Sequence, residues 1–407
     1  MKHMLNVALT TTVLALLCGC GPETKKEKAP GPRKSAASFT VPPELVRRGV
    51  YTDVRFTLSG PGDVTIAVHA SNGSVVRHLT SRVVEKDSLT QKVTWDGRDD
   101  YGKPAPAGCR IAVGLGLGVK FDRTFTWKQG SYGSAACLAI DRQREQLYVA
   151  GSAVPGVLRV NGRTGRVDTL HMISRNVYGD PGAPTGVKGE LQVSDIALDV
   201  DGEIYVRLYR DDGKSVVRRY DRGGISILFG NRREIELSHQ SPGSGLNGLA
   251  VDRDGDVYVV NFAKHNVLDV YGSQGIVTRK AHIPRLSSEG WGPRLGPGKE
   301  LYFTEAVRSR GRLVRYAGSK SQVVFEGVSV APFDVDAFGR AAVPDTKSSR
   351  VKLIDAAGKL IGSFETAGKP YAIAISDEAL YVYDEVKRRV VRGTFVFAHR
   401  VELPVPK

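Results

Sequence analysis

Apolar and polar residues alternate along most of the chain, in short runs that turn residues separate. Residues 54–58, 64–68 and 111–115 each place an apolar side chain at every second position. A period of two is the pattern of β-strands with one buried face. Residues 60–63 (GPGD) and 71–73 (SNG) supply tight turns between such runs. The pattern predicts an all-β protein whose first folded unit, residues 46–118, is a small β-sandwich.

A repeat occupies the rest of the chain, residues 125–407. Each copy has an apolar strand that ends near an Asp, a turn that usually contains Gly, and a further strand, most often with an aromatic residue. Two more strands follow each copy. The copies are residues 137–151, 195–209, 248–262, 291–305, 333–345 and 372–384. Because radial repeats of four strands are typical of propellers, we predict a six-bladed β-propeller.

Two parts of the first unit resemble a known domain. Residues 95–102 (WDGRDDYG) and 106–108 (PAG) are similar to the Ig-like domain of flagellar hook-cap (FlgD-type) proteins. Cys109 departs from that family, which has a large apolar residue there. The resemblance implies an Ig-like sandwich that Trp95 plugs, with Asp96 and Asp99 bonding turn amides. A catalytic role for these two carboxylates is the alternative.

The repeat also carries a resemblance. Residues 246–259 (LNGLAVDRDGDVYV) resemble NHL-repeat propellers and the related gluconolactonase family. That family implies a divalent metal in the central channel, bound by Glu, Asn and Asp at the starts of the inner strands. Asn247 matches this pattern, whereas Asp195 and Glu289 lie one and two positions out of register. The alternative function is therefore a Ca²⁺- or Mg²⁺-dependent sugar lactonase or related hydrolase that uses Asn247 with Asp195 or Glu289.

Further candidate residues surround the predicted mouth of the propeller. Those at the starts of inner strands are Ser194, Asn247, Trp291 and Tyr371. Those near the ends of the second strands are Arg207, Glu305, Asp345 and Asp384. Acidic groups beside a basic wall suit a zwitterionic or sugar ligand. The alternative is that these carboxylates only bond neighbouring loop amides.

The N-terminus predicts export. Residues 1–19 have a polar start and an apolar core that is too short for a comfortable transmembrane helix, as in a secretory signal peptide. Residues 17–20 (LCGC) resemble a bacterial lipobox, which implies cleavage before Cys20 and lipidation of that residue. An ordinary signal peptide with a chance cysteine is the alternative. Gly21, rather than Asp, favours the outer membrane, and the polar residues 20–45 predict a disordered tether.

The net charge indicates which classes of partner to expect, and the cysteine content indicates the state of the thiols. The net charge of +15 favours anionic lipid or acidic polysaccharide over nucleic acid outside the cytoplasm, unless the charge is spread evenly. Cys109 and Cys137 are expected as buried free thiols, with a disulfide as the alternative in an oxidising compartment. The chain contains no CxxC, CxxCH or HExxH motif.

These observations lead to one hypothesis. The chain is expected to be a monomeric lipoprotein, anchored outside the cytoplasm, whose propeller binds an envelope protein or glycan without a cofactor and without catalysis. A third reading is a structural assembly protein whose basic surface packs against an anionic envelope polymer.

Overall fold

The structure is a computed structural model of the 407-residue chain. It describes residues 37–127, 137–151, 157–170, 192–209, 214–237, 248–261, 267–283, 290–318 and 320–406. The predicted signal peptide, Cys20 and the tether up to residue 36 lie outside the described residues. The described part is all-β, and its one helical segment is the short 3-10 turn η1 (Lys86–Ser88). Within these ranges, no helix is long and apolar enough to span a bilayer.

Two sheets share the first hydrophobic core. A three-stranded sheet has the order β1-β2-β5, and a six-stranded sheet ends in β6-β3-β4. Alternate residues of both sheets, including Phe56, Ile66, Trp95 and Val113, meet in one buried cluster. The strands are β1 (Phe39–Arg48), β2 (Tyr51–Leu58), β3 (Gly62–His69), β4 (Val75–Val84), β5 (Thr90–Trp95) and β6 (Arg110–Phe125). The predicted alternation therefore produces two layers with their apolar faces together.

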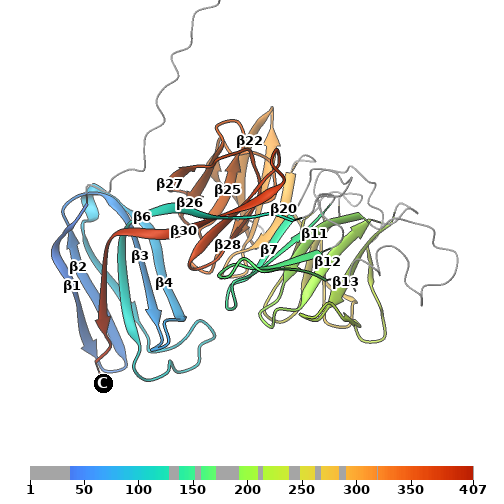
Figure 1. The fold of residues 1–407 in the computed structure, drawn as a ribbon. Helices are drawn as coiled ribbons and strands as arrows, with labels where there is room; N and C mark the ends of the chain where they lie inside the picture. The colour runs from blue at the N-terminus through green and yellow to red at the C-terminus, as the bar shows by residue number, and fades with distance from the viewer. Residues whose placement is uncertain are drawn as a thin grey trace, which may run out of the picture. The chain divides into compact units, whose positions relative to one another are not determined.

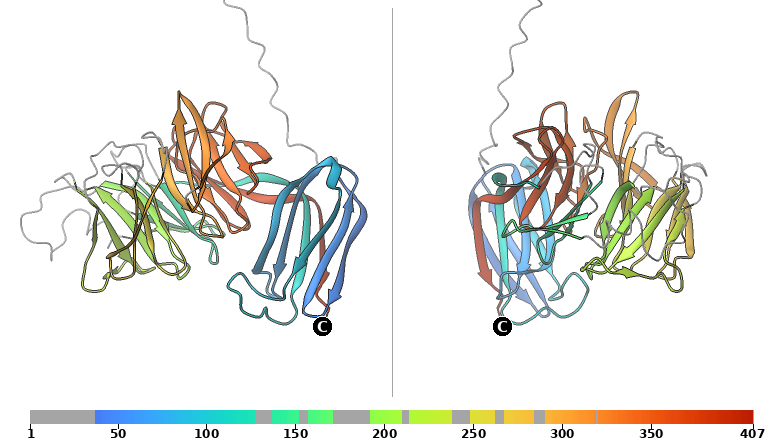
Figure 2. Two further views of the ribbon diagram at one scale, coloured as in Figure 1. Left: turned by 180° about the vertical axis from the view of Figure 1, so that it is seen from behind. Right: turned by 45° about the vertical axis from the view of Figure 1, so that its right-hand side comes forward.

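The last strand of the chain joins this first unit to the repeats. β30 (Arg389–Pro404) pairs antiparallel with β6 from Val390↔Phe125 to Pro404↔Arg110. Its first half also pairs with β29 of the last repeat, and the part of β6 near Leu115 pairs with β3. β6 and β30 lie side by side in both orientations of the ribbon (Figures 1 and 2). One sheet, β28-β29-β30-β6-β3-β4, thus runs through both parts of the chain.

These strands correct two predicted boundaries. β1 begins at Phe39, so the prediction of a disordered tether is wrong for residues 39–45. β6 continues through residues 118–125, where we predicted a break between domains. The first unit also takes residues 397–404 from the C-terminus of the chain, which the alternating pattern assigned to the propeller. Strand pairing between distant segments has no local sequence signal, and this explains the misplaced boundaries.

The repeats form a series of antiparallel sheets. Four-stranded sheets are β7–β10, β16–β19, β20–β23 and β24–β27, and β11–β15 form a five-stranded sheet. In chain order, the first two sheets contain β7 (Cys137–Asp141), β8 (Gln146–Ala150), β9 (Val157–Asn161), β10 (Val167–Thr169), β11 (Gln192–Leu198), β12 (Ile204–Tyr209), β13 (Ser215–Tyr220), β14 (Ser226–Ile227) and β15 (Ile235–Leu237). The third and fourth sheets contain β16 (Leu249–Val251), β17 (Val257–Asn261), β18 (Val267–Tyr271), β19 (Val277–His282), β20 (Gly290–Leu295), β21 (Leu301–Val307), β22 (Arg310–Ala317) and β23 (Lys320–Glu326). The remaining strands are β24 (Asp334–Val335), β25 (Ala341–Asp345), β26 (Arg350–Ile354), β27 (Leu360–Glu365), β28 (Pro370–Ile375) and β29 (Ala379–Asp384).

The first strands of these sheets follow one another around a centre. In chain order, each of β7, β11, β16, β20, β24 and β28 contacts the next, and β28 contacts β7 again. Apolar clusters fill the spaces between neighbouring sheets, as between β8 and β29 and between β12 and β17. Sheets packed radially around a centre define a β-propeller, and the fold prediction is confirmed at that level.

The Asp of the repeat makes a turn. Oδ1 of Asp252 accepts the main-chain N–H groups of Asp254 (2.9 Å) and Asp256 (3.0 Å), and Asp199 and Asp336 make the same pair of bonds two and four residues on. Oδ2 of Asp252 accepts the hydroxyl of Tyr258 from the next strand (3.0 Å). The recurring Asp and aromatic residue therefore stabilise a hairpin and are not free to bind a ligand.

The first unit and the propeller are also joined by charged side chains. His78 of β4 lies between Asp100 (Nδ1–Oδ2 2.5 Å) and Asp377 (Nε2–Oδ1 2.8 Å), and 7% of its side chain is exposed. Both ring nitrogens face carboxylates, so both donate and the ring is an imidazolium. Burial alone would lower the pKa of His78, but the hydrogen bonds to the two carboxylates outweigh it and raise the pKa to about 9.

Candidate functional site

A buried ion pair occupies the centre of the propeller. Asp195 of β11 has no exposed surface, and Arg294 of β20 meets it with two hydrogen bonds of 2.8 and 3.0 Å. The same guanidinium donates to the carbonyl oxygens of Leu249 (2.9 Å) and Phe333 (3.1 Å). Arg294 therefore ties together inner strands of four successive sheets. Burial alone would lower the pKa of Arg294, but the nearby Asp195 carboxylate raises it, so the pair stays ionised.

Asp195 accepts a third hydrogen bond, from the main chain of the neighbouring inner strand. Its Oδ2 also accepts the main-chain N–H of Leu249 at 2.7 Å. These three hydrogen bonds, two of them from a cation, use all but one of the roughly four lone-pair sites of the carboxylate, and a divalent cation there would face the positive charge of the Arg294 guanidinium. Asp195 therefore does not fit the divalent-metal site that the gluconolactonase resemblance implies. The other two predicted ligands, Asn247 and Glu289, lie outside the described residues.

A second pair repeats this arrangement on the other side of the ring. The Arg142 guanidinium donates to both oxygens of Asp334 (3.3 Å each) and to the carbonyl oxygen of Val335 (2.6 Å). Asp334 also accepts the main-chain N–H of Ile375 at 3.0 Å, as Asp195 does from its own neighbouring strand. In each case, an Asp of one inner strand accepts hydrogen bonds from an arginine and from a main-chain N–H of the next inner strand. Among the described residues, no group of three His, Cys, Asp or Glu side chains could hold a metal ion.

The cysteines are not reactive groups. Cys109 and Cys137 are both buried free thiols, as predicted, so the disulfide alternative is excluded. Burial, together with the charge of nearby Asp195, raises the pKa of Cys137 well above its usual value. A thiol with a raised pKa is a poor nucleophile, so the centre of the propeller offers no cysteine chemistry.

The predicted acidic residues of the last three repeats are paired inside their own sheets. Glu305 of β21 is fully buried against Arg312 of β22 (2.7 Å). In the next two sheets, Asp345 pairs with Lys352 (2.8 Å) and Asp384 pairs with Arg389 (3.5 Å). Burial alone would raise the pKa of Asp345, but Lys352 and a nearby serine lower it. The second strand of each sheet thus supplies a carboxylate, and the third strand neutralises it.

Ser194 and Arg207 are also engaged. The Ser194 hydroxyl donates to the carbonyl oxygen of Arg207 (3.3 Å), across the β11–β12 pair. Arg207 is fully buried and donates to the Ser215 hydroxyl (3.2 Å) and to the carbonyl oxygen of Gly248 (3.2 Å). A Cβ atom at Gly248 would lie 2.1 Å from the carbonyl oxygen of Gly292, so only glycine fits there. These residues stabilise contacts between neighbouring sheets.

Trp291 and Tyr371 remain half-buried at the starts of β20 and β28. Trp291 packs against the apolar cluster that contains Tyr302 and Phe333, and its buried Nε1 has no hydrogen-bond partner. Tyr371 packs against a different cluster, with Tyr383. Of the predicted mouth residues that the structure describes, these two aromatic side chains have the fewest polar contacts, so they are the best candidates for ligand contact.

Sequence reasoning missed Arg294, Arg142 and His78. Asp195 and Arg294 are 99 residues apart, and Arg142 and Asp334 are 192 apart. Arginine in an inner strand gives no local sign of its partner, because pairing depends on where the ring brings the strands. No motif in the sequence could have identified these pairs.

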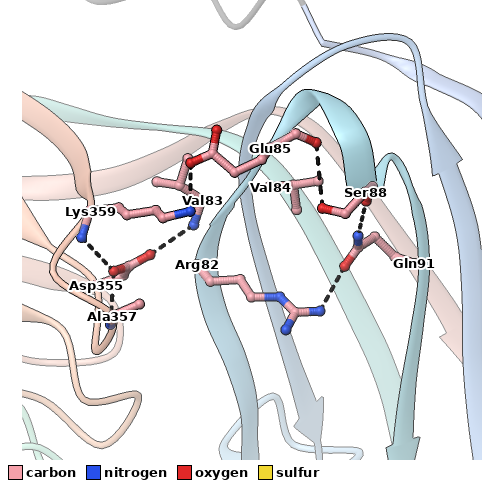
Figure 3. Close-up of a pocket in the computed structure, with 9 residues that line it drawn as sticks. All are labelled: Arg82, Val83, Val84, Glu85, Ser88, Gln91, Asp355, Ala357 and Lys359. Carbon is pink, nitrogen blue, oxygen red and sulfur yellow. Dashed lines mark hydrogen bonds and ion pairs between the residues drawn. The ribbon is translucent and has the colours of Figure 1, made fainter.

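A shallow cleft lies between the first unit and the propeller (Figure 3). Its volume is about 310 Å³, and its lining residues are Arg82, Val83, Val84, Glu85, Ser88, Gln91, Asp355, Ala357 and Lys359. Lys359 pairs with Glu85 (2.5 Å), and Arg82 donates to Gln91 (2.7 Å). Asp355 accepts the main-chain N–H of Lys359 (2.8 Å). Since the charged groups satisfy one another, we assign the cleft to the joint between the two parts.

The fold is a β-propeller whose inner strands are linked by the ion pairs of Asp195 with Arg294 and of Asp334 with Arg142. No known family model matches the sequence. No curated protein matches it either. Solved structures similar to the chain include a Bacteroides thetaiotaomicron protein of unknown function (12% identity, 88% of this chain and 99% of the other, TM-score 0.48).

Two other similar structures have named functions. One is a gluconolactonase from Xanthomonas campestris (15% identity, 72% of this chain and 99% of the other, TM-score 0.45). The other is the calcium-binding protein regucalcin from Agrobacterium tumefaciens (15% identity, 68% and 94%, TM-score 0.44). Similarities of this size carry no activity over to the present chain.

Proposed function

We propose that this protein is a lipid-anchored binding protein of the cell envelope, whose propeller binds a protein or glycan without catalysing a reaction. The observation that carries the proposal is the ion pair of Asp195 and Arg294. It fills the place where a related lactonase would need an open carboxylate, and it turns the channel into a rigid support. Binding then takes place on the face of the propeller, around Trp291 and Tyr371.

The finer architecture belongs to the same proposal. We infer six blades, formed by the sheets that begin with β7, β11, β16, β20, β24 and β28, with β6 as the outer strand of the last. We also assign the first unit to the FlgD-type Ig-like sandwiches. In support, the Trp95 indole is buried and donates to the carbonyl oxygen of Arg98 (2.8 Å), and Oδ1 of Asp99 accepts two turn amides.

The proposed location rests on the sequence of the N-terminus. Cleavage before Cys20 and lipidation of its thiol place the folded part outside the cytoplasm, and Gly21 favours the outer membrane. Mass spectrometry of the protein from its native membrane tests this. We expect an acylated N-terminal peptide that begins at Cys20, and no acylation in a Cys20→Ser variant. An unmodified peptide that begins elsewhere would contradict the anchor.

The metal-dependent lactonase is the second candidate. It uses Asn247 with Asp195 or Glu289, and the Asp195 route requires breaking the buried ion pair with Arg294. Elemental analysis of the full mature chain carrying Cys20→Ser, dialysed free of trace metals, separates the two candidates. We expect no stoichiometric Ca²⁺ or Mg²⁺ and no turnover of sugar lactones. One ion per chain, lost in Asn247→Ala, would overturn the non-catalytic proposal.

Partner capture tests the proposed binding surface. A variant with Trp291→Ala, Tyr371→Ala and Asn247→Ala is expected to lose an envelope partner that the unmodified chain retains. A variant of three exposed residues on the opposite face, Arg163→Gln, Arg166→Gln and Lys320→Gln, is the matched control. Retention of the partner by both variants would move the site away from this face.

A further inference from the structure

Three hairpins present their tips on one face of the propeller. They connect β21 to β22, β25 to β26, and β29 to β30. The register pairs Glu305 with Gly290 and Asp384 with Pro370, so the ends of β21 and β29 lie beside the starts of the inner strands β20 and β28. The tips that follow these strand ends therefore surround the same face as Trp291 and Tyr371. All three tips, residues 308–309, 346–349 and 385–388, belong to the described part of the chain.

The tips are positively charged. Arg308, Arg310 and Lys347 are exposed and make none of the ion pairs that hold the strands together. Lys387 and Arg388 add two further cations at the third tip. We name these five residues, Arg308, Arg310, Lys347, Lys387 and Arg388, the cationic rim.

Backbone conformation projects the rim outward. Arg308 and Ser309 have φ values of +49° and +66°, the left-handed conformation that closes a two-residue hairpin. Ser349 (+53°) and Arg388 (+47°) have the same conformation at the other two tips. Non-glycine residues adopt it at a cost, and at two of these four positions the residue is an arginine of the rim, Arg308 or Arg388.

Among the described residues of these three sheets, most carboxylates near the tips are already paired. Glu305, Asp345 and Asp384 pair with cations of their own sheets, as described above, and Glu385 pairs with Lys369 (2.6 Å). Two exposed carboxylates, Glu326 and Glu365, lie at the ends of the outer strands β23 and β27, beyond the hairpins. Counted over the described residues of these three hairpins, the rim therefore has an excess of positive charge, which attracts an anionic ligand.

The rim has little apolar surface. Its large exposed hydrophobic side chains are Val307 (37%) and Val386 (72%), within the described part of these three hairpins. Protein interfaces bury a core of aromatic and aliphatic anchors, which this rim does not offer. Cations that recur at the corresponding hairpin of three sheets match instead a linear polymer whose charge also repeats. We propose that the cationic rim binds an acidic polysaccharide, a ligand class that makes the proposed binding function more specific and depends on it.

Polygalacturonate is the probe, with neutral dextran of similar length as its control. The protein is the full mature chain with Cys20→Ser. We expect binding to polygalacturonate that weakens steeply as salt rises, and no binding to dextran. In the variant Arg308→Asn, Arg310→Gln, Lys347→Gln, the affinity should fall at least about tenfold, since three screened contacts are lost. Asn replaces Arg308 because it tolerates the left-handed conformation.

The variant Arg163→Gln, Arg166→Gln, Lys320→Gln removes the same charge from turns on the opposite face. It should keep the affinity for polygalacturonate within about twofold, because the rim is intact. Equal losses in both variants would show diffuse attraction and overturn the rim. Equal binding of polyglutamate would overturn the glycan in favour of an acidic protein. If the rim variant keeps an envelope partner that the Trp291, Tyr371 and Asn247 variant loses, this inference fails and the proposed function stands.

Discussion

Asp195 lies at the centre of the propeller without exposed surface, and Arg294 neutralises it there. At the residue scale, this pair decides what the channel can do. An isolated buried carboxylate would be costly, whereas one that accepts three hydrogen bonds and faces a guanidinium is stable in its ionised form. The same chemistry that makes Asp195 acceptable in the core also removes it from metal coordination.

Breaking this pair should be far more costly than breaking a surface pair. Arg294→Met leaves Asp195 buried and unpaired, and we expect the free energy of unfolding to fall by about 3–5 kcal/mol. Urea unfolding followed by circular dichroism measures it. Arg163→Gln breaks the exposed pair with Glu378 and should cost less than about 1 kcal/mol. A loss below about 1 kcal/mol in Arg294→Met would show that the pair is not what stabilises the centre.

At the element scale, β6 and β30 determine how the chain is divided. Each has 16 residues, about three times the length of an ordinary strand, and each belongs to both parts of the molecule. The C-terminal half of β30 completes the sheet that covers the first core. The first unit therefore depends on residues that the chain supplies last.

Removing residues 397–407 tests that dependence. The deletion exposes the main-chain groups of Arg110–Leu117 that pair with β30, so we expect hydrogen exchange throughout β3 and β6 to accelerate. The inner strands from β7 to β28 should keep their protection. Deletion of residues 406 and 407 alone is the control, since β30 ends at Pro404. Unchanged exchange in β3 after the longer deletion would contradict the shared sheet.

At the scale of the whole molecule, His78 links the first unit to the propeller. It is clamped by Asp100 of the first unit and Asp377 of the propeller, and Phe338 packs edge-on to its ring at 4.5 Å. Burial would raise the pKa of Asp377, but the hydrogen bond to His78 lowers it, so the carboxylate stays ionised. Arg77 lies 3.8 Å from Asp100, and Arg142 and Arg340 lie near Asp377.

The joint should therefore weaken at alkaline pH. Because the folded-state pKa of about 9 exceeds the unfolded value of 6.5, His78 stabilises the fold fully below pH 6.5. This contribution, on the order of 3 kcal/mol, is lost as the pH rises from 6.5 to 9. Denaturant unfolding across this range measures the decline. His78→Gln should be less stable at pH 6.5 and should lack this part of the pH dependence.

A control is available in the same chain. His399 of β30 is exposed, and a variant His399→Gln should keep the decline of the unmodified protein. If the unmodified chain and His78→Gln show the same pH dependence, the imidazolium does not join the two parts.

The agreement between sequence and structure is greatest for local features. Period-two alternation and the Asp-containing turn predicted an all-β propeller, because strand faces and hairpins depend on neighbouring residues. The buried free state of Cys109 and Cys137 was also predicted. The blade number, the Ig-like assignment, the lipid anchor and the location stay predictions.

The ligand-binding role of the candidate residues stays a prediction, but their partners could not be predicted. Arg207, Glu305, Asp345 and Asp384 were chosen by their position after the second strand of each repeat, and the structure shows that each bonds within or between sheets. Their partners lie on other strands, and sequence spacing does not say which strands meet.

The sequence by itself determined where strands and turns form, because alternation, Asp and Gly act over a few residues. Only the tertiary structure decided which strand completes which sheet, and which arginine reaches which aspartate. The two arginine–aspartate contacts join residues that are 99 and 192 positions apart, and closing the ring is what brings them together. The charge on the three hairpin tips belongs to both levels: the sequence supplies the cations, and the fold places them on one face.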